Sequence, residues 1–388
     1  MSRTVPQLAE VYPGRFPAGY VNDVHGWAFD RRTVEENVGK LLTLDMDFGA
    51  ICTLNCPSCF RKNNTVDSMS GRSLDFDQLV VVVRQALPLG LRSVKFLGAG
   101  DPFENARFLE FLRFLRDVDV IPLIFTKGHV IGDDRLVQRH FGYLGVRSGE
   151  ALVEELDRCG VSIMLGFNSF DDAIQAKLVG APVTYVAARN RALELLVAQG
   201  MASGSPTRIA LAANPITKWN LDDASEIYEW GRRRNLYVIA TPTMVSGRAK
   251  KEATWKAITP SEDELVALYT RIYSFNIDNG LQTLEQVERE GVSAYAGGHP
   301  CNQVATGLYV TLGGTVLSCP GDVAVEGDVW DGGLEQVWLK SRNRNERAGK
   351  FNCGCIAKDG KSIPSRLFQR VVHELRARHG VSADLTTS

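Results

Sequence analysis

The sequence predicts an α/β protein in which six β/α units share one parallel sheet, and three observations support this fold class. First, six apolar segments of strand length alternate with helical segments between residues 42 and 244, as in sheets with right-handed crossovers. Second, the strand segments are apolar in their cores, as in strands buried on both faces. Third, the six units are fewer than the eight of a closed barrel, which leaves a partial (β/α)6 barrel or an open doubly wound sheet.

The predicted strands are separated by recognisable turns and breakers. SVKFLGAG runs into a Gly-rich turn, VIPLIFTKG is followed by a turn, and TRIALAANP stops at Pro215. Proline cannot donate to the hydrogen-bond ladder of a sheet, so it limits the strand. In a parallel sheet of this kind, reactive groups gather at the carboxyl ends of the strands. The strands are predicted at residues 42–51, 93–100, 120–128, 161–169, 207–215 and 236–244.

The predicted helices lie between these strands. ENARFLEFLRFLRDV has apolar residues at helical spacing, and SGEALVEELDRCG has Ser148 as its N-cap and Gly160 as its stop. A further helix, residues 259–275, follows the last strand, with a capping box from Thr259 to Glu262. The helices between strands are predicted at residues 73–90, 104–118, 148–160, 184–200 and 221–235.

The pattern of the chain changes outside these six units. The first residues are polar, with a short helix near TVEENVGKLL, and the region after residue 300 is rich in Cys and Gly with short β signals. PSRLFQRVVHELRARHG is a closing amphipathic helix. The predicted organisation is an N-terminal extension, the six-unit domain, a linker with a helix, a small Cys-rich α+β module, and a C-terminal helix and tail, at residues 1–43, 44–245, 246–300, 301–360 and 361–388.

Charge and hydropathy exclude several classes of partner. The 388 residues carry 44 Lys+Arg against 45 Asp+Glu. This balance gives no overall attraction to nucleic acid or to an anionic membrane. We find no apolar stretch of about 18 residues and no secretory signal, so we expect a cytoplasmic protein without a membrane segment. Its eight cysteines would then stay reduced, which favours metal binding or catalysis over disulfides.

Three of these cysteines are crowded just after the first strand. Cys52, Cys56 and Cys59 have the spacing C-x3-C-x2-C. Thiolates bind zinc or iron–sulfur clusters, but structural zinc takes four ligands. The triplet resembles the signature of the radical S-adenosylmethionine (radical SAM) superfamily, and the alternative is a zinc knuckle. The resemblance implies that the three cysteines hold a [4Fe–4S] cluster whose open iron binds SAM, and that reduction of the cluster cleaves SAM to a 5′-deoxyadenosyl radical.

Polar and glycine residues at other strand ends fit the same resemblance. GAGD follows the second strand, where the superfamily has a Gly-Gly-Glu-like motif that contacts the amino group of SAM. Glycine lets the backbone approach a ligand, and a carboxylate accepts from an ammonium group. The resemblance therefore implies SAM contacts from Gly98, Gly100, Asp101, Asn168, Ser169 and Asn214.

A second group of cysteines lies in the C-terminal region. Cys301 and Cys319 frame a hairpin with the pattern C-x12-G-x4-C, and Cys353 and Cys355 follow as a C-x-C pair. This arrangement resembles the Twitch and SPASM extensions of radical SAM enzymes. The resemblance implies a partial (β/α)6 barrel with a Twitch/SPASM-like module, in which these four cysteines hold one auxiliary [4Fe–4S] cluster. A structural zinc site remains the alternative, and His299 is a possible further ligand.

The resemblance implies an enzyme, and we expect it to act on a small polar substrate. The leading expectation is an oxidoreductase that abstracts hydrogen from an alcohol carbon of an aminocyclitol or sugar precursor of a natural product. Its electron donor would be a flavodoxin or ferredoxin. Alternatives are a sugar epimerase or dehydratase, modification of a ribosomal peptide, and a non-catalytic zinc or iron–sulfur interaction protein. The short N-terminal extension counts against the peptide alternative.

The catalytic residues stay unassigned at this point. Lys127 and Arg248 follow strands but are poor candidates for a base. An epimerase would need a hydrogen donor such as Cys159, Tyr269 or Tyr273. Cys159 is expected at the amino-terminal face of the sheet, where packing in the core is the more natural role of a thiol.

Overall fold

The computed structural model describes residues 2–61 and 71–380 and contains one nine-stranded sheet. The strand order is β6-β5-β4-β3-β2-β1-β7-β8-β9. Strands β1 to β6 are the six predicted strands, and five of them lie within their predicted segments. Strand β5 continues through Pro215 to Ile216, so the prediction that this strand stops at Pro215 is wrong by one residue. The strand bounds are β1 Thr43–Met46, β2 Ser93–Phe96, β3 Ile121–Thr126, β4 Ser162–Gly166, β5 Ile209–Ile216, β6 Tyr237–Pro242, β7 Gly307–Val310, β8 Thr315–Leu317 and β9 Val325–Asp328.

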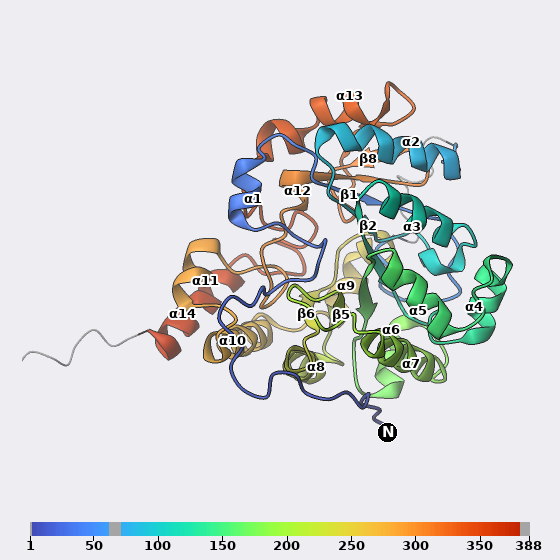
Figure 1. The fold of residues 1–388 in the computed structure, drawn as a ribbon. Coiled ribbons are helices and arrows are strands. Elements are labelled where there is room, and N and C mark those ends of the chain that lie inside the picture. Colours follow the sequence, from blue (N-terminus) through green and yellow to red (C-terminus); the bar gives the residue numbers. More distant parts are fainter. Residues whose placement is uncertain (1, 62–70, 381–388) are drawn as a thin grey trace, which may run out of the picture.

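The helices follow the strands in the β/α order that the sequence predicts, and Figure 1 shows them along the outside of the sheet. Their bounds are α1 Arg31–Glu36, α2 Phe76–Ala86, α3 Phe108–Asp117, α4 Asp134–Phe141, α5 Gly149–Arg158, α6 Asp172–Val179, α7 Tyr185–Ala198, α8 Leu221–Arg233, α9 Glu252–Ile258, α10 Glu262–Asn279, α11 Leu284–Glu290, α12 Gln303–Thr306, α13 Gly333–Lys340 and α14 Leu367–His379.

The two faces of the sheet have different neighbours, and this defines the fold as a partial barrel. Neighbouring strands from β1 to β6 are parallel throughout. The outer face packs against the helices in one large apolar core. The inner face forms a smaller apolar cluster with Val24 and Trp27 of the N-terminal segment and with Tyr295. A doubly wound sheet would carry helices on both faces, so the partial-barrel expectation is the one confirmed.

The C-terminal region continues this sheet. Strand β7 pairs in parallel with β1, with Asp45 opposite Tyr309, and β8 and β9 follow in antiparallel pairs. The region that carries the second cysteine group is therefore fixed to the strand that precedes the first group. The domain boundaries at residues 43, 245, 300 and 360 stay predictions.

Local differences from the predicted elements have simple causes. The capping box of α10 uses Ser261 and Glu264, so the prediction of Thr259 and Glu262 is wrong by two residues. Both pairs fit the same sequence pattern, and only the backbone geometry separates them. Cys159 is the C-cap of α5 and lies in the large core with 2% exposure, which confirms its packing role.

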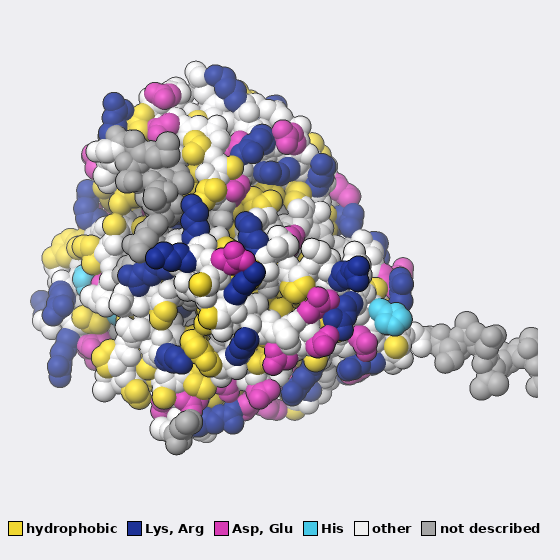
Figure 2. Space-filling model, turned by 180° about the vertical axis from the view of Figure 1, so that it is seen from behind, with side chains coloured by type: hydrophobic (Ala, Val, Ile, Leu, Met, Phe, Trp, Pro, Cys, Tyr) yellow, Lys and Arg dark blue, Asp and Glu magenta, His cyan; other side chains and the backbone are white. Residues whose placement is uncertain are grey.

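The surface carries both signs of charge. Figure 2 shows Lys and Arg side chains interspersed with Asp and Glu on one face of the molecule. Within residues 2–61 and 71–380, no helix is both long and apolar enough to cross a bilayer.

Candidate functional site

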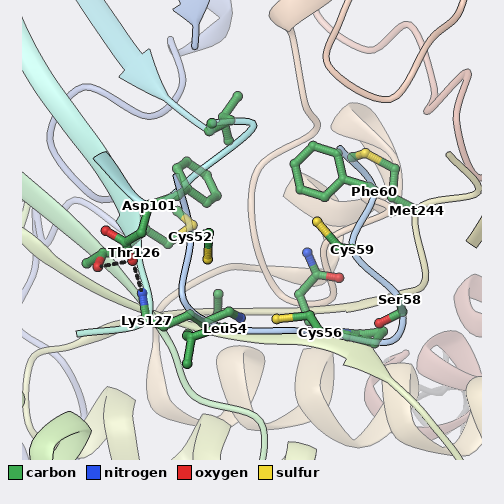
Figure 3. A pocket seen from close by; sticks show the side chains of 18 of the residues that line it. Cys52, Leu54, Cys56, Ser58, Cys59, Phe60, Asp101, Thr126, Lys127 and Met244 are labelled. Carbon is green, nitrogen blue, oxygen red and sulfur yellow. Dashed lines mark hydrogen bonds between the residues drawn. The ribbon is translucent and has the colours of Figure 1, made fainter. Parts of the chain in front are cut away.

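The first three cysteines lie in the loop after β1 and line a cavity at the carboxyl ends of the strands. The wall also contains residues that follow β2, β3 and β6, and residues from β4 and β5. Figure 3 shows the side chains of Cys52, Cys56 and Cys59 around one open space. The structure thus confirms the expectation that reactive groups gather at this end of the sheet.

Three glycines allow neighbouring segments to pack closely against this cysteine loop. A Cβ atom on Gly100 would lie 2.2 Å from the carbonyl oxygen of Ile51, and one on Gly180 would lie 2.2 Å from that of Asn55. A Cβ atom on Gly247 would lie 2.4 Å from the carbonyl carbon of Phe60. No side chain fits at these distances, so the path of the loop depends on glycine at all three positions. Sequence reasoning missed Gly180 and Gly247.

Polar side chains hold the same loop from both sides. Glu104 accepts hydrogen bonds from the backbone N–H and Oγ1 of Thr53, at 2.9 Å and 3.0 Å, and from Nε2 of His129 at 2.9 Å. Burial alone would lower the pKa of His129, but Glu104 and Asp101 outweigh it and raise that pKa. On the other side, Arg248 donates to the Asn55 side chain at 2.6 Å and to the carbonyl of Cys56 at 3.0 Å. Arg248 therefore positions the loop.

Four of the six predicted SAM contacts line the first cavity. These are Gly98, Gly100, Asp101 and Asn214. In the part of the chain that the structure describes, Asn168 and Ser169 are absent from that lining. Their backbone N–H groups donate to Oε1 of Gln175 at 2.7 Å and 3.1 Å. This contact stabilises the loop between β4 and α6, and their part in binding SAM stays a prediction.

Asp101 has a structural role beside its place in the cavity wall. Its Oδ2 accepts from Thr126 Oγ1 at 2.8 Å and from the backbone N–H of Lys127 at 3.1 Å. These bonds tie the turn after β2 to the end of β3, as Figure 3 shows. A carboxylate has about four acceptor sites, so Asp101 retains capacity for a ligand.

The electrostatics of the loop suit a cationic cofactor. Burial, followed by the charge of Asp101, raises the pKa of the Cys52 thiol to about 12. A thiolate at this place therefore needs a nearby positive charge, and a bound metal centre deprotonates its thiol ligands. The three sulfurs around one cavity thus fit an iron–sulfur cluster.

A second cavity adjoins the first and reaches the C-terminal cysteines. The two share the walls formed by Phe60, Leu97, Phe125, Asn214 and Met244. Cys301, Cys319 and Cys355 line the second cavity, whereas Cys353 is absent from its described lining. Among the described residues, no three Cys, His, Asp or Glu side chains are close enough to hold a single metal ion. A cluster of several irons spaces its ligands more widely than one ion does.

A buried ion pair adds polarity to the second cavity. Asp45 on β1 and Lys95 on β2 are 2% and 3% exposed, and both line the cavity. Nζ of Lys95 donates to Oε1 of Gln303 at 2.7 Å and lies 3.4 Å from Oδ1 of Asp45. That oxygen has no hydrogen-bond partner of normal geometry among the described residues. The pair is therefore placed to bind a polar group in a largely apolar cavity.

No model of a protein family matches the sequence, and no curated protein matches it. Solved structures do share its fold. Streptococcus suis SuiB bound to precursor peptide SuiA matches with a TM-score of 0.55 and 14% identity, over 87% of this chain and 78% of SuiB. Native anSMEcpe with bound AdoMet and Cp18Cys peptide matches with a TM-score of 0.59 and 13% identity, over 87% and 97%. SuiB bound to S-adenosylmethionine matches with a TM-score of 0.52 and 14% identity, over 87% and 80%.

At these identities the similarity concerns the fold, and it supports the predicted α/β partial barrel. SuiB and anSMEcpe each have a structure with SAM bound.

Proposed function

We propose that this chain is a radical SAM enzyme. The observation that carries the proposal is the position of Cys52, Cys56 and Cys59, which follow β1 and surround one cavity at the carboxyl end of a partial barrel. The sharing of this fold with two proteins that bind SAM supports it.

The residues of the first cavity divide into two roles under this proposal. The three cysteines would hold a [4Fe–4S] cluster, and Gly98, Gly100, Asp101 and Asn214 would bind SAM beside it. When bound and reduced, the cluster supplies the electron that cleaves SAM to methionine and a 5′-deoxyadenosyl radical. A flavodoxin or ferredoxin is the proposed source of that electron.

For the substrate, we propose a small molecule with an alcohol group that occupies the second cavity. After a hydrogen atom leaves the alcohol carbon, the radical must lose one proton and one electron to become a ketone. Oδ1 of Asp45 is the proposed acceptor of the hydroxyl proton, because it lines the cavity and lacks a normal hydrogen-bond partner. The electron would pass to a centre at the second cysteine group, which lines the same cavity.

Removing the first cysteines tests the proposed function. A chain with Cys52→Ala, Cys56→Ala and Cys59→Ala is expected to bind about four fewer irons than the wild type, the content of one [4Fe–4S] cluster. It should form no 5′-deoxyadenosine from SAM under dithionite, measured by mass spectrometry. Cleavage that persists in the triple variant would refute the proposal, and zinc in place of iron would favour the non-catalytic alternative.

The three hydrogen donors that the sequence suggests lie outside both cavities, which supports oxidation, although the phenol of Tyr295 lines the second cavity. Cys159 lies in the outer core, Tyr269 donates to the carbonyl of Ala294 at 2.8 Å, and Tyr273 accepts from the N–H of Ser293 at 2.8 Å. None of the three belongs to the described lining of either cavity. A substrate radical in either cavity therefore cannot take a hydrogen atom from Cys159, Tyr269 or Tyr273.

Solvent deuterium separates the two outcomes. With aminocyclitols and sugars as candidate substrates in D2O, we expect a product about two mass units lighter, since the overall oxidation removes two hydrogens, with no deuterium on carbon. A product of unchanged formula with one carbon-bound deuterium would instead establish epimerisation.

Peptide modification is a second candidate function. SuiB and anSMEcpe were solved with a precursor peptide and with Cp18Cys peptide. Peptides can be compared with sugars in one assay, in which deuterium from a labelled candidate is followed into 5′-deoxyadenosine. Transfer from a peptide but from no sugar would establish this second candidate.

A further inference from the structure

The C-terminal cysteines do not form one group of four. Cys301, Cys319 and Cys355 line the second cavity together. The Cys353 sulfur instead donates to the carbonyl oxygen of Lys350 at 3.6 Å.

The backbone of the C-x-C pair explains why its two thiols diverge. Gly354, between them, has φ +70°, a conformation that other residues rarely adopt. The N–H of Gly354 donates to Oδ1 of Asn352 at 3.0 Å, and the N–H of Cys355 donates to Oδ2 of Asp359 at 2.7 Å. These bonds fix the turn with Cys355 facing the cavity and Cys353 facing the carbonyl group of Lys350.

A buried cation accompanies the three cysteines. Lys358 is fully buried, and its Nζ donates to Oγ1 of Thr241 at 2.5 Å and lies 4.5 Å from the ring centroid of Tyr295. Its backbone N–H donates to the carbonyl oxygen of Cys355 at 2.9 Å, and Tyr295 lines the second cavity together with the three cysteines. Thiolates at these three positions would offset the cost of burying this ammonium group.

Asp359, Asp45 and His299 are further potential ligands in this region. Asp359 is engaged by the N–H of Cys355, and Asp45 lies beside Lys95. His299, the further ligand that the sequence suggested, is not part of the described cavity wall. The second cavity is bordered by the three cysteines and by the Asp45–Lys95 pair.

We propose that the second centre is a [4Fe–4S] cluster held by Cys301, Cys319 and Cys355 alone, with its fourth coordination position open to the second cavity. This inference rests on the proposed function. Cys353 is outside the centre. The open position would take an oxygen or nitrogen donor of the bound small molecule, whose remaining polar groups reach Asp45 and Lys95.

The two cysteines of the C-x-C pair provide a matched comparison. Both variants are made in full-length chains that also carry Cys52→Ala, Cys56→Ala and Cys59→Ala, so that only the second centre can bind iron. The parent is expected to hold about four irons per chain. Cys353→Ala should retain that iron and the parent's electron paramagnetic resonance spectrum after reduction, and Cys355→Ala should lose most of both. Equal iron loss in the two variants, or loss in Cys353→Ala alone, overturns the proposal.

The open position is tested without any substitution in the second group. Potassium [13C]cyanide added to the reduced parent should give a 13C hyperfine coupling, since a free iron site can bind it. An absence of coupling overturns the inference even if Cys355→Ala fails to fold. Zinc, or no metal, in the parent also overturns it. Reductive SAM cleavage by the wild type is measured in parallel, and its absence alone would refute the proposed function while leaving the second centre in place.

Discussion

Gly180→Ala is expected to remove iron from the first cysteine site and to abolish reductive SAM cleavage. Gly180 is the C-cap of α6 with φ +61°, and an added Cβ would lie 2.2 Å from the carbonyl oxygen of Asn55. Asn55 lies between Cys52 and Cys56, so the loop must move for the methyl group to fit. Iron analysis and the yield of 5′-deoxyadenosine measure both effects.

Gly160→Ala is the matched control for this variant. Gly160 has φ +64°, but an added Cβ would meet nothing within 4 Å. Both substitutions carry the cost of an unfavourable φ, about 1–3 kcal/mol, and only Gly180→Ala adds the collision with the cysteine loop. Equal iron content in the two variants would show that this contact does not position the cysteines.

Ionisation of Asp45 should make a large contribution to the change of the free energy of unfolding with pH. Burial raises the pKa of this carboxyl group to about 6, although Lys95 opposes the shift. An aspartate in the unfolded chain has a pKa of about 3.9. Because the folded pKa is the higher one, the contribution of Asp45 is fully present below pH of about 4 and is lost as pH rises through about 6. A difference of about two pKa units corresponds to about 3 kcal/mol.

Asp45→Asn removes this dependence because an amide does not ionise. Urea unfolding of both chains between pH 4 and 8 should show the wild type losing about 3 kcal/mol relative to the variant. Asp117→Asn, at an exposed position of α3, should follow the wild type. Parallel curves for wild type and Asp45→Asn would contradict the burial argument. The same variant should retain SAM cleavage and lose substrate oxidation.

The sequence predicts the barrel strands well because their apolar residues are buried on both faces, and Asp45 on β1 and Lys95 on β2 are buried exceptions. It also places Cys52, Cys56 and Cys59 at a strand end, since the chain order of the β/α units decides that position. Helices such as α4, with the polar sequence DRLVQRHF, were not predicted. Their apolar residues are too few for a clear helical period, and packing in the fold determines them.

Other features of the site depend on contacts between distant segments, which a single sequence does not contain. Gly180 and Gly247 have no local signal that connects them to the cysteine loop. The hydrogen bonds of Asn168 and Ser169 to Gln175 are equally hidden. The Cys353 side chain points away from the second cavity because of the turn at Gly354 and the hydrogen bond from Cys355 to Asp359. The spacing of the cysteines in the sequence reveals neither feature.

The pairing of β1 with β7 has a consequence for synthesis of the protein. Strand β1 is complete at Met46, but its second neighbour ends at Val310. While the ribosome makes the intervening chain, β1 keeps one edge of unpaired backbone groups next to the cysteine loop. Such edges recruit other strands and promote aggregation. We therefore expect the nascent chain to depend on chaperones until β7 emerges and closes that edge.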